Sequence, residues 1–282
     1  MLNPMRSRNS EKARRPIPAV AAIRLDSFDM GDGSANHPAS ATQNDLLAAL
    51  PASDLDFLAP HLEYVELSFG KELHTQGSKL SHVYFPTTAI IATIYLLSDG
   101  AMTEIGVTGH EGFIGISILL AENELGTAKV QSAGHAYRLK ASVLKQACLR
   151  CGKLQYFLMR YTHALFAQMA QNSVCSHHYS FDQQFSRWLL DRLDRLPANV
   201  LKATQEMIAN MLGVRRETVT EAAGRLQQAG LIRNYRGMIT VLDRDGLELL
   251  AGECYQVVRH EFDRVLAGSA PPARIAEQAL AA

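Results

Sequence analysis

The sequence has few cysteines, no net charge and no long apolar run. Four cysteines among 282 residues do not make the disulfide framework of a small secreted protein. The 28 basic and 28 acidic residues cancel, so the whole molecule has no field that attracts nucleic acid or a membrane. No apolar run approaches the length of about 18 residues that a membrane span needs, and no cleavable signal is present. We therefore expect a cytoplasmic protein without a membrane partner.

The rest of the composition is that of an ordinary globular chain. Hydrophobic residues make up 47% and charged residues 20%, which is enough apolar material for more than one core. Residues 1–40 and 267–282 show no sustained hydrophobic period, and we expect a disordered leader and a disordered tail there. The folded units should lie between them.

Short alternating runs separated by glycine-containing turns dominate residues 41–141. Helical spacing comes first, broken at Pro51 and Pro60. The runs that follow include HVYFP and AIIATIYLL, and the Asp99-Gly100 pair between two of them is a hairpin signal. This pattern predicts a small antiparallel β barrel or roll with room for one small ligand.

A long helical period covers residues 142–180. Apolar residues there recur at alternating steps of four and three, which is the seam of a coiled coil. A polar residue on such a seam commonly fixes the register of a dimer. We therefore expect a dimerisation helix, with an ordinary core helix as the alternative. The predicted dimer residues are Leu154, Leu158, Tyr161, Leu165 and Asn172.

Two helices joined by a tight turn are predicted in the stretch TQEMIANMLGVRRETVTEAAGRLQQAGLI, within a domain over residues 181–266. Thr204 is a suitable N-cap for the first helix, and Gly213 supplies its left-handed stop. Only Val214 separates that stop from the second helix, so the pattern is that of a helix-turn-helix. The second helix should bury Val219, Ala222, Ala223 and Leu226.

This arrangement leaves the polar residues of the second helix free to meet DNA. Arg216 can pair bidentately with guanine, and Glu217 can accept a hydrogen bond from cytosine. A strand, a turn at Arg236-Gly237 and a returning strand follow, which predicts a β wing. The predicted DNA-binding residues are Thr204, Arg215, Arg216, Glu217, Thr218, Thr220, Glu221, Arg233 and Arg236.

The same stretch resembles the winged helix-turn-helix of the Crp/Fnr superfamily of bacterial transcription regulators, whose recognition helix carries the same R-E-T-V run. The resemblance extends over about residues 45–266. It implies an α+β protein with an N-terminal antiparallel β jelly roll of the cyclic-nucleotide-binding type, a long dimerisation helix and a C-terminal DNA-binding domain. It also implies that Arg216 and Glu217 contact bases, whereas the family's second base-reading arginine is replaced here by Glu221. The expected partners are double-stranded DNA, a second copy of the chain and RNA polymerase.

The stretch EGFIGISILLAENELGTAKV resembles the family's phosphate-binding cassette but departs from its chemistry. Cyclic-nucleotide binders in the family have a glutamate and an arginine where this chain has Ile116 and Gly126. A buried phosphate without its guanidinium would be an unpaired charge. We therefore expect no useful affinity for cyclic AMP, no resident cofactor and an effector that the sequence does not identify. The candidate effector residues are Gly112, Phe113, Gly115, Ile116, Gly126, Thr127 and Ala128.

Other chemistries are weaker readings of the sequence. Cys148 and Cys151 have the spacing of a metal or redox pair, and Cys175 and Cys254 stand far from them in the sequence. The pair at His177 and His178 is interpreted as an exposed polar hinge in preference to a haem or metal ligand set. We predict no metal site. No nucleophile elbow, phosphate loop or paired carboxylates indicate an enzyme.

Two alternative functions remain open at this stage. The roll could be an interaction or dimerisation module to which DNA binding is secondary. It could also be a cyclic-nucleotide sensor whose phosphate partner has moved to another position. Comparing the affinity for a palindromic duplex with that for random DNA separates a regulator from an interaction module.

Overall fold

The computed structural model describes residues 40–120, 123–150 and 152–267. The predicted disordered leader and tail lie outside the described residues, apart from Ser40 and Ala267, and so does Cys151. Within the described part of the chain, no helix combines the length and the apolar character needed to cross a membrane.

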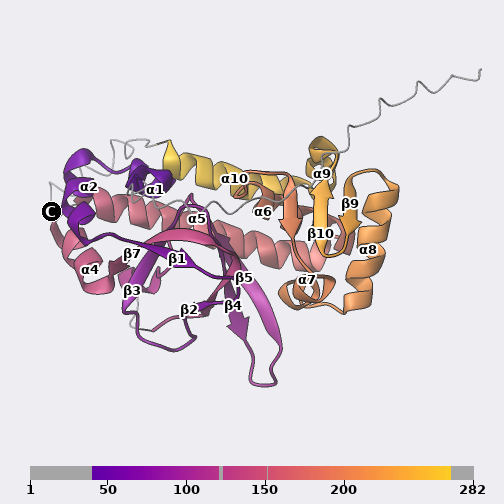
Figure 1. Ribbon diagram of the computed structural model, residues 1–282, viewed down its shortest axis with the longest axis horizontal. Helices are drawn as coiled ribbons and strands as arrows, with labels where there is room; N and C mark the ends of the chain where they lie inside the picture. Colours follow the sequence, from indigo (N-terminus) through magenta and orange to yellow (C-terminus); the bar gives the residue numbers. More distant parts are fainter. Residues whose placement is uncertain (1–39, 121–122, 151, 268–282) are drawn as a thin grey trace, which may run out of the picture. The chain divides into compact units, whose positions relative to one another are not determined.

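The N-terminal part is a β-roll preceded by short helical segments (Figure 1). The two proline-broken helical pieces that the sequence predicts are confirmed. The segments are η1 (Ala41–Gln43), α1 (Asp45–Ala48), α2 (Ala52–Leu58) and η2 (Ala59–His61). The strands are β1 (Glu63–Leu67), β2 (Glu72–His74), β3 (His82–Pro86), β4 (Ile90–Leu96), β5 (Met102–Thr108), β6 (Thr127–Ser132) and β7 (Gly134–Lys140), with α3 (Ser117–Leu120) between β5 and β6.

The roll consists of two antiparallel sheets with their apolar side chains between them. One sheet has the order β1-β7-β3 and the other β2-β6-β4-β5. Leu67, Ile91 and Ala136 are fully buried, because successive residues of a strand point to opposite faces. The predicted hairpin is confirmed: the Leu97 N–H donates to the Ala101 carbonyl at 2.8 Å, and Gly100 has φ 88°.

Two helices follow the roll, where the sequence analysis expected one. They are α4 (Ala141–Arg150) and α5 (Gly152–His178). The predicted dimer seam lies on the side of α5 that packs on its own chain. Leu158 and Tyr161 are fully buried within one protomer, in a cluster that includes Phe113 of the roll.

The seam residues therefore pack within one protomer, and their role in a dimer stays a prediction. Leu154 and Leu165 belong to the same buried cluster, and the Asn172 side chain donates to the Ile105 carbonyl at 3.1 Å. A stripe with heptad spacing is equally the pattern of a helix that covers a sheet, and a core helix is what the structure contains.

The C-terminal part is a small winged domain. Its elements are α6 (Phe181–Leu193), β8 (Val200–Lys202), α7 (Gln205–Leu212), α8 (Arg216–Gln228), β9 (Ile232–Tyr235), β10 (Met238–Val241) and α9 (Arg244–Ala251), and the sheet order is β8-β10-β9. Ser180 caps α6 through a reciprocal capping box with Gln183. Phe185, Leu189 and Ile208 are fully buried in the core of this domain.

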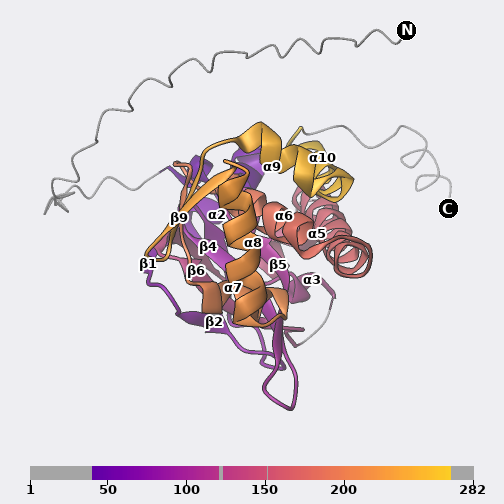
Figure 2. The same cartoon turned by 90° about the vertical axis from the view of Figure 1, so that its right-hand side faces the viewer.

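The last described helix, α10 (Glu253–Leu266), packs along α5, and Figures 1 and 2 both show the two helices side by side. Val258, Phe262 and Val265 join the buried cluster that α5 shares with the roll. The Phe262 ring lies 6.0 Å from the Tyr161 ring, centroid to centroid. Although α10 falls inside the range 181–266 expected for the DNA-binding domain, its apolar side chains complete the core of the N-terminal part.

Candidate nucleic-acid interface

The first helix of the predicted helix-turn-helix is capped at both ends as expected. The Thr204 hydroxyl accepts from the Met207 N–H at 3.1 Å, and Gly213 adopts φ 67° as the left-handed C-cap. The Val214 N–H donates back to the Ala209 carbonyl at 3.0 Å, so α8 begins two residues later with its direction already turned.

The second helix, α8, buries the predicted face. Val219 and Ala222 are fully buried, and Ala223 and Leu226 are each 2% exposed. Helical geometry then places the residues between these positions on the opposite side. The exposed residues of the N-terminal half are Arg215, Arg216, Glu217, Thr220 and Glu221, with Thr218 partly buried among them.

The N-terminus of α8 has the properties of an anion site. Arg215 occupies the N-cap position in an extended conformation, and its side chain forms no capping hydrogen bond with the described residues. The first amides of a helix have no partner inside the helix and bear a partial positive charge. Nearby phosphate oxygens could satisfy these amides.

The β wing adjoins this helix end. Arg236 and Gly237 form its turn with φ 48° and 76°, and the pair of positive φ values matches the twist of a tight hairpin. The Arg236 guanidinium lies 5.1 Å from the centre of the Tyr235 ring. Arg233 points to solvent from β9. The predicted wing is thus confirmed as an element, and two of its arginines are free to meet a ligand.

A groove of about 470 Å³ joins α7, α8 and the wing. It brings together Thr204, Arg216 and Arg236 of the predicted residues. Gln205 and Asn234 also line it, and sequence reasoning missed both. The Thr220 hydroxyl donates to the Gln205 side chain at 2.8 Å across the two helices, so this glutamine is held at the groove. Figure 2 shows α8 on the face turned to the viewer, with α7 below it.

Charge pairing separates the arginines of α8 into two classes. Arg225 binds Asp182 of α6 through two hydrogen bonds of 2.8 and 2.7 Å. Glu221 lies 3.8 Å from the same arginine. Arg216 and Arg215 have no acidic partner among the ion pairs of the described residues, so their guanidinium groups remain available.

The cassette residues of the roll are used for packing. Phe113 lies between the Phe85 and Tyr161 rings, at centroid distances of 5.5 and 5.3 Å. Gly112 approaches Tyr161 so closely that an added Cβ would lie 2.2 Å from its ring. Gly115 has φ 110°, which favours glycine.

The two ends of the cassette belong to different buried clusters. Ile116 packs on the cluster that contains Phe113, whereas Ala128 belongs to the cluster between the two sheets. At Gly126 an added Cβ would lie 2.9 Å from the Ile94 carbonyl oxygen, and the Thr127 hydroxyl accepts from the Gln76 N–H at 3.2 Å. A larger side chain at position 126 would require the backbone to shift.

Cys175 of α5 and Cys254 of α10 interact with each other, although they are far apart in the sequence. Cys175 and Cys254 are buried, and burial raises the pKa of the Cys175 thiol to about 11. His177 Nδ1 lies 2.8 Å from the Ser173 carbonyl oxygen. No group of three or more metal-ligating side chains occurs among the residues that the structure describes.

Three buried arginines of the winged domain were not predicted from the sequence, and two of them pair with acidic residues of the roll. Arg192 pairs with Glu104 of β5, and Arg195 pairs with Glu111 at 2.7 Å. Arg187 lies 3.6 Å from Asp191. Burial raises the pKa of Asp191, although the neighbouring arginines act in the opposite direction. Arg187, Asp191 and Arg195 follow one another at steps of four residues. This spacing places them on one face of a helix and could have indicated a charged cluster there.

Comparison with known proteins agrees with this architecture. Residues 183–250 match the family described as the Crp-like helix-turn-helix domain. None of the curated proteins is significantly similar to the chain. A structure described as a transcriptional regulator of the Crp/Fnr family from Eubacterium rectale superimposes with a TM-score of 0.60 at 20% identity, covering 75% of this chain and 100% of that one.

Two further solved structures have the same fold. FixK2 from Bradyrhizobium japonicum has a TM-score of 0.61 at 18% identity and covers 68% of this chain and 98% of its own. The c-di-GMP responsive regulator CLP from Xanthomonas campestris has a TM-score of 0.56 at 13% identity, with 68% and 99% covered. The chain thus has the Crp/Fnr fold, with a β-roll and a long helix ahead of a Crp-like helix-turn-helix domain.

Proposed function

We propose that this protein binds double-stranded DNA sequence-specifically and regulates transcription. The observation that carries the proposal is the N-terminus of α8, where Arg216 and Glu217 are exposed opposite the buried Val219 and Ala222. A helix of this kind fits the major groove, with its first residues against the base edges. The chain as a whole has no net charge, so the arginines of this surface provide the local attraction.

Two kinds of contact are expected. Arg216 would pair with guanine and Glu217 with the cytosine amino group, which together select G·C pairs. Glu221 cannot donate to guanine, so the operator should differ from that of relatives with arginine there. Thr204, Thr218, Arg215 and Thr220 would contact phosphate or sugar around the helix end, and Arg233 and Arg236 would do so from the wing.

The protein would bind DNA as a homodimer through the exposed side of α5, opposite the buried seam. Met159 and Phe166 are seven residues apart on this side and are 60% and 62% exposed. Val174 continues the stripe at 41% exposure. Apolar side chains in one row on a solvent-facing helix indicate a partner surface, and a second copy supplies the same row. Two recognition helices would then meet half-sites about 34 Å apart.

The remaining partners follow from this role. A regulator of transcription works in the cytoplasm and contacts RNA polymerase at the promoter. Cyclic AMP is not its effector, because Ile116 and Gly126 provide neither an acceptor for the ribose hydroxyl nor a cation for the phosphate. CLP of Xanthomonas campestris responds to c-di-GMP, so the fold is compatible with effectors other than a cyclic mononucleotide.

A selection from randomised duplexes tests the proposal. The purified chain should enrich a pseudo-palindrome, and fluorescence anisotropy should show it bound at least about a thousandfold more tightly than a scrambled duplex. The affinity should fall steeply with salt, as phosphate contacts require. Equal affinity for the selected and the scrambled duplex would instead favour an interaction module in which DNA binding is secondary.

A further inference from the structure

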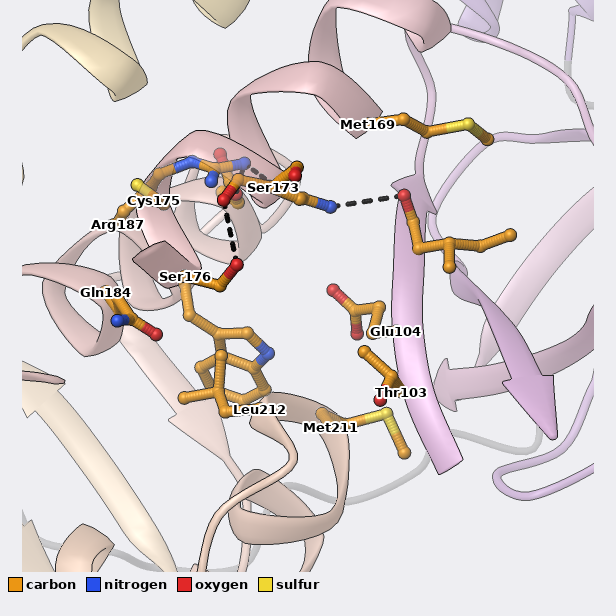
Figure 3. A pocket seen from close by; sticks show the side chains of 14 residues that line it. Thr103, Glu104, Met169, Ser173, Cys175, Ser176, Gln184, Arg187, Met211 and Leu212 are labelled. Atoms are coloured by element: carbon orange, nitrogen blue, oxygen red, sulfur yellow. Dashed lines mark hydrogen bonds and ion pairs between the residues drawn. The ribbon is translucent and has the colours of Figure 1, made fainter. Parts of the chain in front are cut away.

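A cavity of about 340 Å³ lies where the roll, α5 and the winged domain meet (Figure 3). It is separate from the cassette, none of whose candidate effector residues lines it. Figure 3 shows Thr103 and Glu104 reaching it from β5, Ser176 from α5 and Met211 from α7. Its volume is within the range of sites that hold small molecules.

The cavity wall includes buried donors without a partner. Trp188 and Arg187 of α6 line it and are 4% and 5% exposed. Among the residues that the structure describes, neither the Trp188 indole N–H nor Arg187 Nε makes a hydrogen bond. Buried donors in folded proteins are almost always satisfied, so two orphans on one cavity wall indicate a missing acceptor.

The other charges of the cavity are already balanced. Arg187 lies 3.6 Å from Asp191, and Arg192 pairs with Glu104 and stacks 3.8 Å above the Trp188 ring. A ligand with a net charge would therefore be left without a counter-ion. A neutral acceptor such as a carbonyl oxygen satisfies an indole N–H without this cost.

The rest of the wall is mainly apolar. Ile105, Met169, Met211 and Leu212 line it together with Trp188. Methionine side chains adapt to ligands of different shape, and an aromatic face favours a flat ligand. The cavity wall therefore favours ligands whose main part is compact and apolar.

We propose that this cavity binds a small neutral molecule with an apolar body and a carbonyl-type acceptor, which the Trp188 indole N–H and Arg187 hold. The walls come from β5, α5, α6 and α7, so an occupant contacts the roll and the helix-turn-helix at the same time. Occupancy therefore biases the position of α7 and α8 relative to the roll. This last step rests on the proposed DNA binding, whereas binding in the cavity does not.

Trp188 is the only tryptophan of the chain, so its fluorescence reports on the cavity directly. The probe is benzamide, with toluene as the matched molecule that lacks the acceptor. Benzamide at millimolar concentrations should change the emission saturably and bind about tenfold more tightly than toluene, as expected for one buried hydrogen bond. An emission that does not change saturably with benzamide, or equal affinity for both probes, overturns the proposal.

Two variants locate the site. Ser176 and His177 are neighbouring exposed residues at the end of α5, and only Ser176 lines the cavity. Ser176→Phe should fill the space and abolish the benzamide response, whereas His177→Phe should keep it. Trp188→Phe, followed by calorimetry, should weaken benzamide binding about tenfold. Retained binding in the folded Ser176→Phe variant would place the probe elsewhere and overturn the proposal.

DNA binding is measured separately by anisotropy on the selected duplex, with and without benzamide. Specific binding that benzamide changes at least about threefold supports coupling between the cavity and the DNA surface. A fluorescence response with no specific DNA binding would refute the proposed function and leave the cavity site standing. Specific DNA binding with no fluorescence response would support the proposed function and refute the cavity site.

Discussion

Arg195, two residues past the end of α6, and Glu111, three residues past the end of β5, form a buried ion pair between the winged domain and the roll. Arg195 Nη2 lies 2.7 Å from Glu111 Oε1, and the side chains are 6% and 9% exposed. Both carboxylate oxygens also accept from the Gly109 N–H at 3.1 Å. The Glu111 carboxylate is thus bound both by Arg195 and by the backbone of the roll. The ion pair therefore fixes the position of the end of α6 on the β-roll.

Removing one partner of this pair should destabilise the protein strongly. Arg195→Ala leaves the Glu111 carboxylate buried without its cation, and we expect a loss of about 3 to 5 kcal/mol in the free energy of unfolding. Urea unfolding followed by circular dichroism measures it. Arg264→Ala, which breaks the exposed pair with Glu261, is the control and should cost less than about 1 kcal/mol. Similar losses in both variants would contradict the assignment.

Arg216→Ala should weaken binding to the selected duplex by about 1 to 3 kcal/mol and flatten base preference at one position of each half-site. The reason is the loss of a bidentate contact to a base edge. Anisotropy on duplexes with single base changes measures this effect. Lys145→Ala on the exposed side of α4 removes the same charge away from α8 and should change nothing. An equal loss on specific and random DNA would mean that Arg216 contacts only phosphate.

The two sides of α5 should respond differently to an acidic residue. Phe166→Asp, on the exposed side, should shift the protein from dimer to monomer in sedimentation while the circular dichroism spectrum stays unchanged. Leu158→Asp places a charge in the fully buried cluster and should unfold the chain. A monomeric wild type at micromolar concentration, or a Phe166→Asp variant that remains dimeric, would rule out this surface.

Cyclic AMP and cyclic GMP should not bind. The cassette has neither an acidic residue for the ribose nor an arginine for the phosphate, and Gly126 is in contact with the backbone at Ile94. Calorimetry with either nucleotide at millimolar concentrations should show no saturable heat, and operator affinity should be the same with and without the nucleotide. A dissociation constant in the micromolar range would revive the hypothesis of a relocated phosphate partner.

His74 should make the protein sensitive to acid. Burial lowers the pKa of His74 to about 4, whereas the unfolded residue titrates near pH 6.5. The unfolded state therefore binds more protons between these values, so the free energy of unfolding rises with pH across this window and falls as the solution is acidified. His74→Leu should reduce the total change in the free energy of unfolding across this window by about 3 kcal/mol. Urea unfolding of both proteins at a series of pH values measures this change, and the same pH dependence in both would contradict the assignment.

Most elements of the fold could be predicted from the sequence, because local signals determine them. The cap at Thr204, the left-handed Gly213 and the apolar spacing from Val219 to Leu226 define the helix-turn-helix within a few residues. The hairpin at Gly100 and the wing turn at Gly237 follow from backbone conformations that glycine favours. Within the described residues, β2 and β8 were missed because three residues are too few for a periodic signal.

The face of a helix that meets a partner could not be predicted in the same way. An apolar stripe at steps of three and four residues indicates that one side of α5 is buried. It does not indicate whether the same chain or a second copy covers that side. No pattern in the sequence singled out Arg192, although Glu104 and Gln131, distant in the sequence, pair with it in the interior. The periodic spacing of apolar residues along the sequence gives no information about polar contacts between residues that are far apart in the chain.

The packing of α10 on α5 has a consequence for how the protein is made. Tyr161 needs Phe262 to close the interior around it, and about a hundred residues of chain separate the two. A ribosome therefore releases the β-roll with an open flank and completes that flank only after the winged domain has emerged. Until then the nascent chain exposes to water the part of α5 that α10 later covers, and exposed apolar surface of this kind favours aggregation.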